Sequence, residues 1–178
     1  TIGLKDTPVT PYNDMTMSGN SIEASGKTLV INKNGLPETI KINDRQVLAK
    51  PIRFEVVTAT GTIVFAANNL KIKQESTGKI ACTASSVQAG LKFSCDASME
   101  YDGNIEYNIQ LAATDKDVIV QDVRLNTVYA PESSEYFMGA GFAGGLRPEN
   151  HTWDWKGPND SYWMGGDKSG LHVEFIGD

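Results

Sequence analysis

The sequence predicts an all-β chain, folded as an antiparallel β-sandwich. Apolar and polar residues alternate over short runs, and Gly, Asn, Asp and Pro separate these runs, which is the pattern of half-buried strands. No window of a dozen residues shows the i, i+3, i+4, i+7 apolar spacing of a helix. Roughly a dozen short strands, spaced about 8–12 residues apart, are typical of sandwiches and barrels.

The chain has 178 residues, 40% of them hydrophobic, which is enough to bury a core without metals or disulfides. Pro8 and Pro11 predict an irregular lead-in over residues 1–20. The rest, residues 21–178, is expected to form a single sandwich domain that belongs to a larger multidomain protein. Strands are predicted over residues 29–31, 40–42, 52–56, 62–65, 70–73, 79–87, 91–101, 104–112 and 117–129.

Asp102-Gly103 looks like a hairpin turn, yet the apolar residues keep odd parity on both sides of it, from Phe93 to Leu111. A two-residue loop would pair odd with even positions and split the apolar set between the two faces. A continuous strand is therefore favoured, with a three-residue Asp102-Gly103-Asn104 loop as the alternative.

Two cysteines, Cys82 and Cys95, lie in runs that would form a hairpin through residues 87–90. In that hairpin Cys82 lies directly opposite Cys95, at a separation that a disulfide tolerates. Both outcomes stay open: a cross-strand disulfide, or two small buried thiols. No spacing typical of a metal site is present, so we expect neither a metal nor another cofactor.

The net charge of −6 argues against nucleic acid and anionic membranes as partners, since both require clustered Lys and Arg. No apolar run reaches the roughly 20 residues of a membrane span. The first residues lack the apolar region of a signal peptide. A first residue other than Met leaves open an earlier leader.

Residues 136–163 are rich in glycine and contain all three tryptophans of the chain. Aromatic faces stack on sugar rings, and polar side chains bond the hydroxyl groups. A sugar site is therefore expected, unless the aromatic residues are buried and close one end of the sandwich. Its candidate stacking residues are Trp153, Trp155 and Trp163, and its candidate hydrogen-bonding residues are Arg147, His151 and Asp160.

Catalysis by the chain itself is not expected. The carboxylates near the tryptophans could supply the acid pair of a glycosidase, but nothing in the sequence fixes their separation. A sugar epimerase, lyase or hydrolase would need a His or Tyr base beside a carboxylate in a cleft, and His151 and His172 are the two histidines available. No catalytic residue is therefore assigned.

An ordered string of residues carries a family resemblance: Tyr136-Phe137-Met138-Gly139, then Arg147-Pro148, then Asp160-Ser161-x-Trp163. It resembles the N-terminal β-sandwich domain of bacterial proteins related to glycoside hydrolase family 123. The resemblance implies a supersandwich of the galactose-mutarotase-like kind. It also implies a following barrel that hydrolyses N-acetylgalactosaminides. The chain ends at Asp178 without such a barrel, so the family's catalytic residues have no counterparts here.

Together these observations predict a non-catalytic β-sandwich module of a secreted, periplasmic or cell-surface glycan-degrading protein. Its expected partners are a carbohydrate, such as an N-acetylgalactosamine-containing glycan, and a catalytic domain of the same protein. The alternatives are a purely structural interdomain module and, with less support, a sugar-active enzyme in its own right.

Overall fold

The computed structural model describes residues 6–154 and 160–176 and confirms an all-β antiparallel sandwich. In the described residues the one helix is a single 3₁₀ turn, and no helix is long and apolar enough to cross a membrane. The elements are β1 (Thr16–Ser18), β2 (Ser21–Ala24), β3 (Lys27–Ile31), β4 (Pro37–Ile42), β5 (Arg45–Gln46), β6 (Leu48–Thr58), β7 (Gly61–Val64), β8 (Lys71–Ser76), β9 (Lys79–Gln88), β10 (Leu91–Glu100), β11 (Ile105–Ala113), β12 (Asp122–Tyr129), η1 (Pro131–Ser133), β13 (Tyr136–Gly139), β14 (Phe142–Leu146), β15 (Ser161–Gly165) and β16 (Gly170–Glu174).

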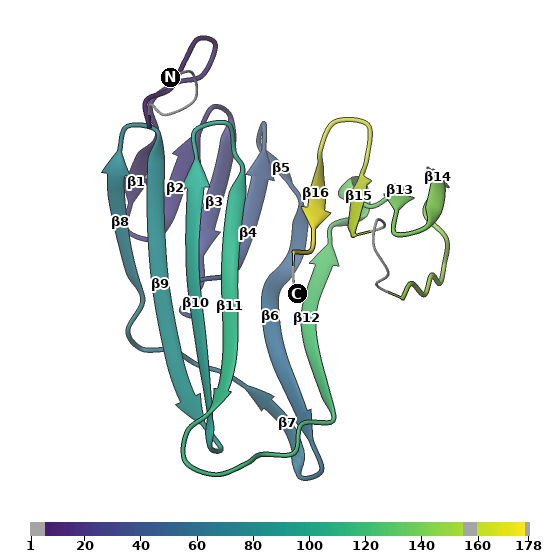
Figure 1. Ribbon diagram of the computed structural model, residues 1–178. Coiled ribbons are helices and arrows are strands. Elements are labelled where there is room, and N and C mark those ends of the chain that lie inside the picture. Colours follow the sequence, from purple (N-terminus) through teal and green to yellow (C-terminus); the bar gives the residue numbers. More distant parts are fainter. Residues whose placement is uncertain (1–5, 155–159, 177–178) are drawn as a thin grey trace.

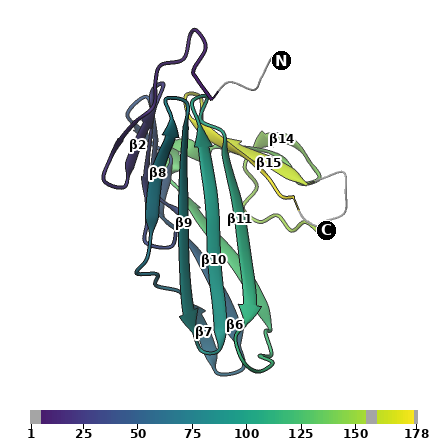
Figure 2. The ribbon, with the colours of Figure 1, turned by 60° about the vertical axis from the view of Figure 1, so that its left-hand side comes forward.

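Two layers make up the sandwich (Figures 1 and 2). One layer is the sheet β11-β10-β9-β8. Behind it lies the sheet β1-β2-β3-β4-β5. Strand β6 runs beside β4 and pairs with β12 on one side and β7 on the other. Within residues 1–20, where the sequence predicts an irregular lead-in, Thr16–Ser18 forms β1 and Met15 is buried in the core.

The chain reverses at Asp102-Gly103, so the continuous strand favoured from the sequence is wrong. Strands β10 and β11 pair antiparallel, with Met99 opposite Ile105. The amide of Glu100 donates to the carbonyl of Asn104, which leaves a three-residue loop over 101–103. This loop begins one residue earlier than the alternative predicted. The parity argument holds, because a three-residue loop pairs odd with odd positions.

The β9–β10 hairpin also differs in register from the sequence expectation. Its turn is the two-residue Ala89-Gly90, so Cys82 lies opposite Ala97 and not opposite Cys95. The two cysteines are diagonal neighbours on adjacent strands. Both are buried free thiols. The turn is shorter than predicted because Ala89 and Gly90 both adopt positive φ angles, of 49° and 77°, as a two-residue hairpin of this type requires.

The sandwich core forms two clusters between the layers. The first cluster lies under β1–β4 and includes the fully buried Ile22 and Ile80. The second is built on three phenylalanines, in which Phe93 lies 5.1 Å from Phe54 and 5.3 Å from Phe65 between ring centroids. Alternating apolar positions on β6, β9 and β10 supply the side chains of these clusters, as period-2 patterning predicts.

Strands β14-β13-β15-β16 form a separate four-stranded sheet, here called the lobe, beside β12 and β6 (Figure 1). The sequence shows few strand signals over residues 130–170, because glycines take the place of the β-branched residues typical of strands. Buried hydroxyls join the lobe to the sandwich. Ser133 Oγ lies 2.6 Å from Ser169 Oγ and donates to the carbonyl of Gln46 at 3.2 Å.

Candidate functional site

The lobe has two faces, and strand register decides which residues share a face. Tyr136 lies opposite Gly165, Met138 opposite Trp163, and Trp163 opposite His172. These residues therefore project from one face, here called the outer platform. Phe137 and Tyr162 alternate with them and project from the other face, here called the inner face.

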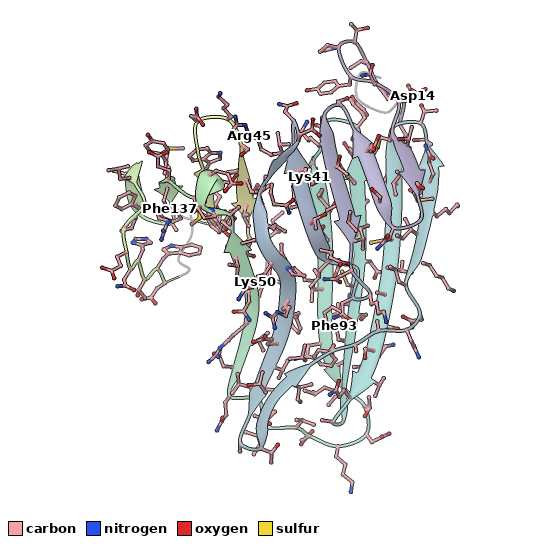
Figure 3. The ribbon with its side chains drawn as sticks, turned by 180° about the vertical axis from the view of Figure 1, so that it is seen from behind. Asp14, Lys41, Arg45, Lys50, Phe93 and Phe137 are labelled. Carbon is pink, nitrogen blue, oxygen red and sulfur yellow. The ribbon has the colours of Figure 1, made fainter. Side chains whose placement is uncertain are left out.

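The inner face is an aromatic cluster. Phe137 is buried, and its ring centroid lies 5.5 Å from that of His151 and 5.7 Å from that of Tyr162. Figure 3 places Phe137 inside the lobe, well apart from Phe93 in the sandwich core. His151 is fixed by contact between its Nε2 and the carbonyl oxygen of Ala140 at 2.8 Å. The residues of this face thus pack on one another.

Tyr162 also links the inner face to the sandwich. Its hydroxyl lies 3.3 Å from the hydroxyl of Tyr129 on β12. Burial raises the pKa of both Tyr129 and Tyr162. Both phenols therefore keep their protons, so one hydroxyl donates a hydrogen bond and the other accepts it. This pair is structural in character.

The outer platform is an apolar and aromatic surface that solvent reaches. Met138 is 53% exposed, Leu146 70% and Tyr136 37%. Trp163 is half-buried. A Cβ atom on Gly165 would lie 2.4 Å from Trp163 Cζ2, and one on Gly170 would lie 3.0 Å from the same atom. The six-membered ring of the indole therefore lies over two glycines, in space that any larger residue would fill.

Acidic groups stand at the rim of the platform. A hydrogen bond with the Glu135 carboxylate and then the charge of Glu135 raise the pKa of Tyr136, and the charge of Asp167 adds to the effect. The Glu135 carboxylate therefore lies near the tyrosine hydroxyl. A carboxylate beside a stacking ring can accept hydrogen bonds from a hydroxyl-rich ligand.

Of the six residues predicted for a sugar site, the five that the structure describes are spread over both sides of the lobe and its edges. Trp163 lies on the outer platform, whereas His151 packs on the inner face. Trp153 lies on that same inner side, with its ring centroid 6.1 Å from that of Phe175. Trp155 lies outside the described residues.

The two other predicted residues serve local structure. The guanidinium Nε of Arg147 donates to the carbonyl of Ser134 at 2.8 Å. Asp160 is half-buried, and its carbonyl accepts from the amide of Phe175. Tyr136 and Met138 also lie on the outer platform and were not among the predicted site residues. Their spacing of two is the available sequence signal, since it places both on one face of a strand, and the pairing of Met138 with Trp163 adds that residue to the same face.

The two histidines lie on opposite faces of the lobe. His151 lies on the inner face and His172 on the outer platform, so the sheet itself separates them. Across residues 6–154 and 160–176, no group of three or more His, Cys, Asp or Glu side chains is placed to hold a metal ion. The exposed aromatic and apolar side chains of the outer platform form a surface on which a ligand or a neighbouring domain could pack.

Comparison with known families gives one match that spans most of the chain. The family model described as "Glycoside hydrolase 123, third domain" matches residues 15–178. The match confirms the resemblance to family 123 seen in the sequence. Its description names the third domain, where the resemblance implied an N-terminal one. No curated protein matches the chain.

Proposed function

Because the chain belongs to the glycoside hydrolase 123 third-domain family, we propose that it is a non-catalytic, carbohydrate-binding module of a glycoside hydrolase-like protein. The outer platform binds the sugar. Trp163 and Tyr136 stack on the apolar face of a pyranose ring, and Glu135, Asp167 and His172 bond its hydroxyl or acetamido groups. The module holds glycan beside a catalytic domain of the same secreted protein.

One observation carries this proposal: the indole of Trp163 lies over Gly165 and Gly170, and Tyr136 lies opposite Gly165 on the same face. A ring supported from below by glycine backbone is held in place before a ligand arrives. Preorganised aromatic groups lose little conformational freedom on binding, which favours affinity. Acidic groups at the rim give such a surface the polar contacts that sugar recognition needs.

A second candidate function, packing against another domain, is favoured by a different observation. Met138 and Leu146 are both more than half exposed and have no hydroxyl-binding chemistry. Contiguous exposed apolar side chains mark protein interfaces. In this reading the outer platform contacts a neighbouring domain of the parent protein and binds no glycan.

Titration of the chain with N-acetylgalactosamine-containing and other glycans, followed by tryptophan fluorescence, tests the first function. We expect Trp163→Ala to weaken binding at least tenfold, or about 1.4 kcal/mol. Trp153→Phe, on the inner side, is the matched control and should bind like the parent chain. A parent chain that responds to no glycan would overturn the sugar proposal.

The packing function has its own readout in the parent protein. Met138→Asp would place a charge on the outer platform and should increase proteolytic cleavage between this module and its neighbour. The same change on the isolated chain should leave thermal stability nearly unchanged, because Met138 is exposed. Unaltered cleavage of the parent protein would count against packing at this surface.

A further inference from the structure

A second surface with binding character lies on the opposite layer of the sandwich. The outward face of β8, β9 and β10 contains a hollow of about 260 Å³. These strands lie on the far side of the molecule from the lobe (Figure 1). The outward residues of an exposed sheet are usually polar, so the polarity alone indicates nothing. The arrangement of charge and side-chain length is what gives this surface a specific chemistry.

Small hydroxyl side chains form the floor of the hollow. Ser85 lies opposite Ser94 in the β9–β10 ladder, and both are half-buried. Asn69 fixes Ser85 twice: its Nδ2 donates to Ser85 Oγ at 2.8 Å, and its Oδ1 accepts from the Ser85 amide at 2.8 Å. Ser85 Oγ therefore accepts from Asn69 and keeps its own proton for another partner.

Longer charged side chains surround this floor. Lys71 and Asp96 flank Thr83 across the sheet, since Thr83 pairs with Lys71 on one side and with Asp96 on the other. Lys92 stands on β10, on the same face as Ser94 and Asp96. Residues with hydroxyl, amide, ammonium and carboxylate groups thus line one hollow, which matches the mixed donors and acceptors of a sugar.

The charge of the hollow narrows the ligand class. Two lysines and one aspartate line it, which gives a formal excess of one positive charge in a chain whose net charge is −6. The ion pairs of the described residues are Lys79–Glu75 and Arg124–Asp122, so neither Lys71 nor Lys92 takes part in one. A ligand that carries one acidic group would neutralise this excess positive charge.

We propose that this hollow on β8–β10 binds a saccharide that carries one acidic substituent, a sulfate or a carboxylate. Lys71 and Lys92 attract the acidic group. Asp96 accepts hydrogen bonds from sugar hydroxyls, and Ser85 and Ser94 bond the ring substituents. This site is separate from the outer platform and does not depend on sugar stacking at Trp163.

The test is a titration of the intact ¹⁵N-labelled chain with galactose 6-sulfate, glucuronate and neutral galactose, followed by the amide signals of Thr83, Ser85 and Ser94. Both acidic sugars should bind at least tenfold more tightly than galactose. Raising the salt concentration from 0.02 to about 0.3 M should weaken them, because exposed charges are screened. Inorganic sulfate at equal concentration should bind more weakly than either, since it has no hydroxyl group to donate to Asp96.

Variants separate the hollow from the rest of the chain. Lys92→Gln and Lys71→Gln should each reduce the preference for the acidic sugars several-fold. Lys73→Gln, an exposed lysine on the same strand as Lys71 but outside the hollow, should leave it unchanged. All three positions are exposed, so folding is preserved.

Three outcomes would overturn the proposal: no shift at these amides, equal binding of galactose and its 6-sulfate, or binding of inorganic sulfate as tight as that of the sugar. Trp163→Ala should leave this titration unaltered. Failure at the hollow and failure at the outer platform are therefore distinguishable.

Discussion

At the scale of single residues, the two cysteines illustrate what burial does to chemistry. Burial raises the pKa of the Cys82 thiol from 9.0 to about 11. Burial, and then the neighbouring Cys82, raises the pKa of the Cys95 thiol to about 12. The thiolate is the reactive form of cysteine. Both side chains are therefore expected to be inert in the folded chain.

Labelling with a thiol reagent checks this directly. At pH 8 the native chain should react negligibly over minutes, whereas in 6 M guanidinium chloride two thiols per chain should react. Unfolded, unreduced chain that yields no reactive thiol would show that Cys82 and Cys95 form the disulfide considered from the sequence. In 6 M guanidinium chloride, a chain carrying Cys82→Ala should yield one reactive thiol, that of Cys95, whether or not the parent chain has a disulfide.

The raised thiol pKa values also predict a pH dependence of stability. In the unfolded chain the thiols ionise near pH 9, before they do so in the folded chain. Stability is therefore fully present below pH 9 and is lost as the pH rises toward 11. Between pH 9 and 10 each thiol should lower the free energy of unfolding by up to about 1.4 kcal/mol per pH unit. Urea unfolding should show a smaller slope in the double variant Cys82→Ala/Cys95→Ala.

At the scale of elements, the two-residue turn Ala89-Gly90 sets the register in which β9 pairs with β10. Ala89 has a φ of 49°, a conformation that costs a side-chain-bearing residue about 1–2 kcal/mol and that Asn tolerates better. Ala89→Asn should therefore raise the free energy of unfolding by about 0.5–1 kcal/mol, as measured by urea unfolding.

The neighbouring glycine provides the opposite test of the same turn. Gly90→Ala places a side chain at a φ of 77°, and its Cβ would lie 3.4 Å from Val118 Cγ2. This variant should lower the free energy of unfolding by about 1 kcal/mol. Stabilisation by Gly90→Ala, or destabilisation by Ala89→Asn, would contradict the turn conformation described here.

At the scale of the whole molecule, the lobe depends on a few buried contacts with the sandwich. Ser133 is fully buried and lies in hydrogen-bond contact with Ser169 and the carbonyl of Gln46. Ser133→Ala would leave Ser169 and that carbonyl without this partner, at a cost of about 1–3 kcal/mol. Hydrogen exchange should then speed up at the amides of β15 and β16.

The sandwich itself provides the internal reference in that experiment, because the amides of β9 and β10 should keep their protection. Ser134→Ala is the matched variant and should have little effect, since the Ser134 hydroxyl donates to the nearby carbonyl of Pro131 and the substitution keeps the Ser134 carbonyl that accepts from Arg147. Equal loss of protection in β9, β10 and the lobe would mean that the two unfold as one unit.

Much of the sandwich follows from local patterning. Strands β3, β4 and β6–β12 overlap the predicted runs, because alternation of apolar and polar residues reports which face is buried. The strands of the lobe were not predicted, since Gly139, Gly144, Gly145 and Gly165 give no alternation to read. A Cβ atom on Gly139 would lie 2.5 Å from the carbonyl oxygen of Ser161, and one on Gly165 would lie 2.4 Å from Trp163 Cζ2, so the close packing that requires these two glycines is visible only in the folded chain.

The sequence by itself determined the all-β class, the positions of most strands, the parity across Asp102-Gly103 and the aromatic character of residues 136–163. These features are local, and the period of two reports them directly. The tertiary structure decided the hairpin registers, the diagonal placement of Cys82 and Cys95, and the separation of Trp163 from His151. A turn one or two residues shorter, or a side chain one position further along a strand, changes the partner or the face, and composition does not encode either change.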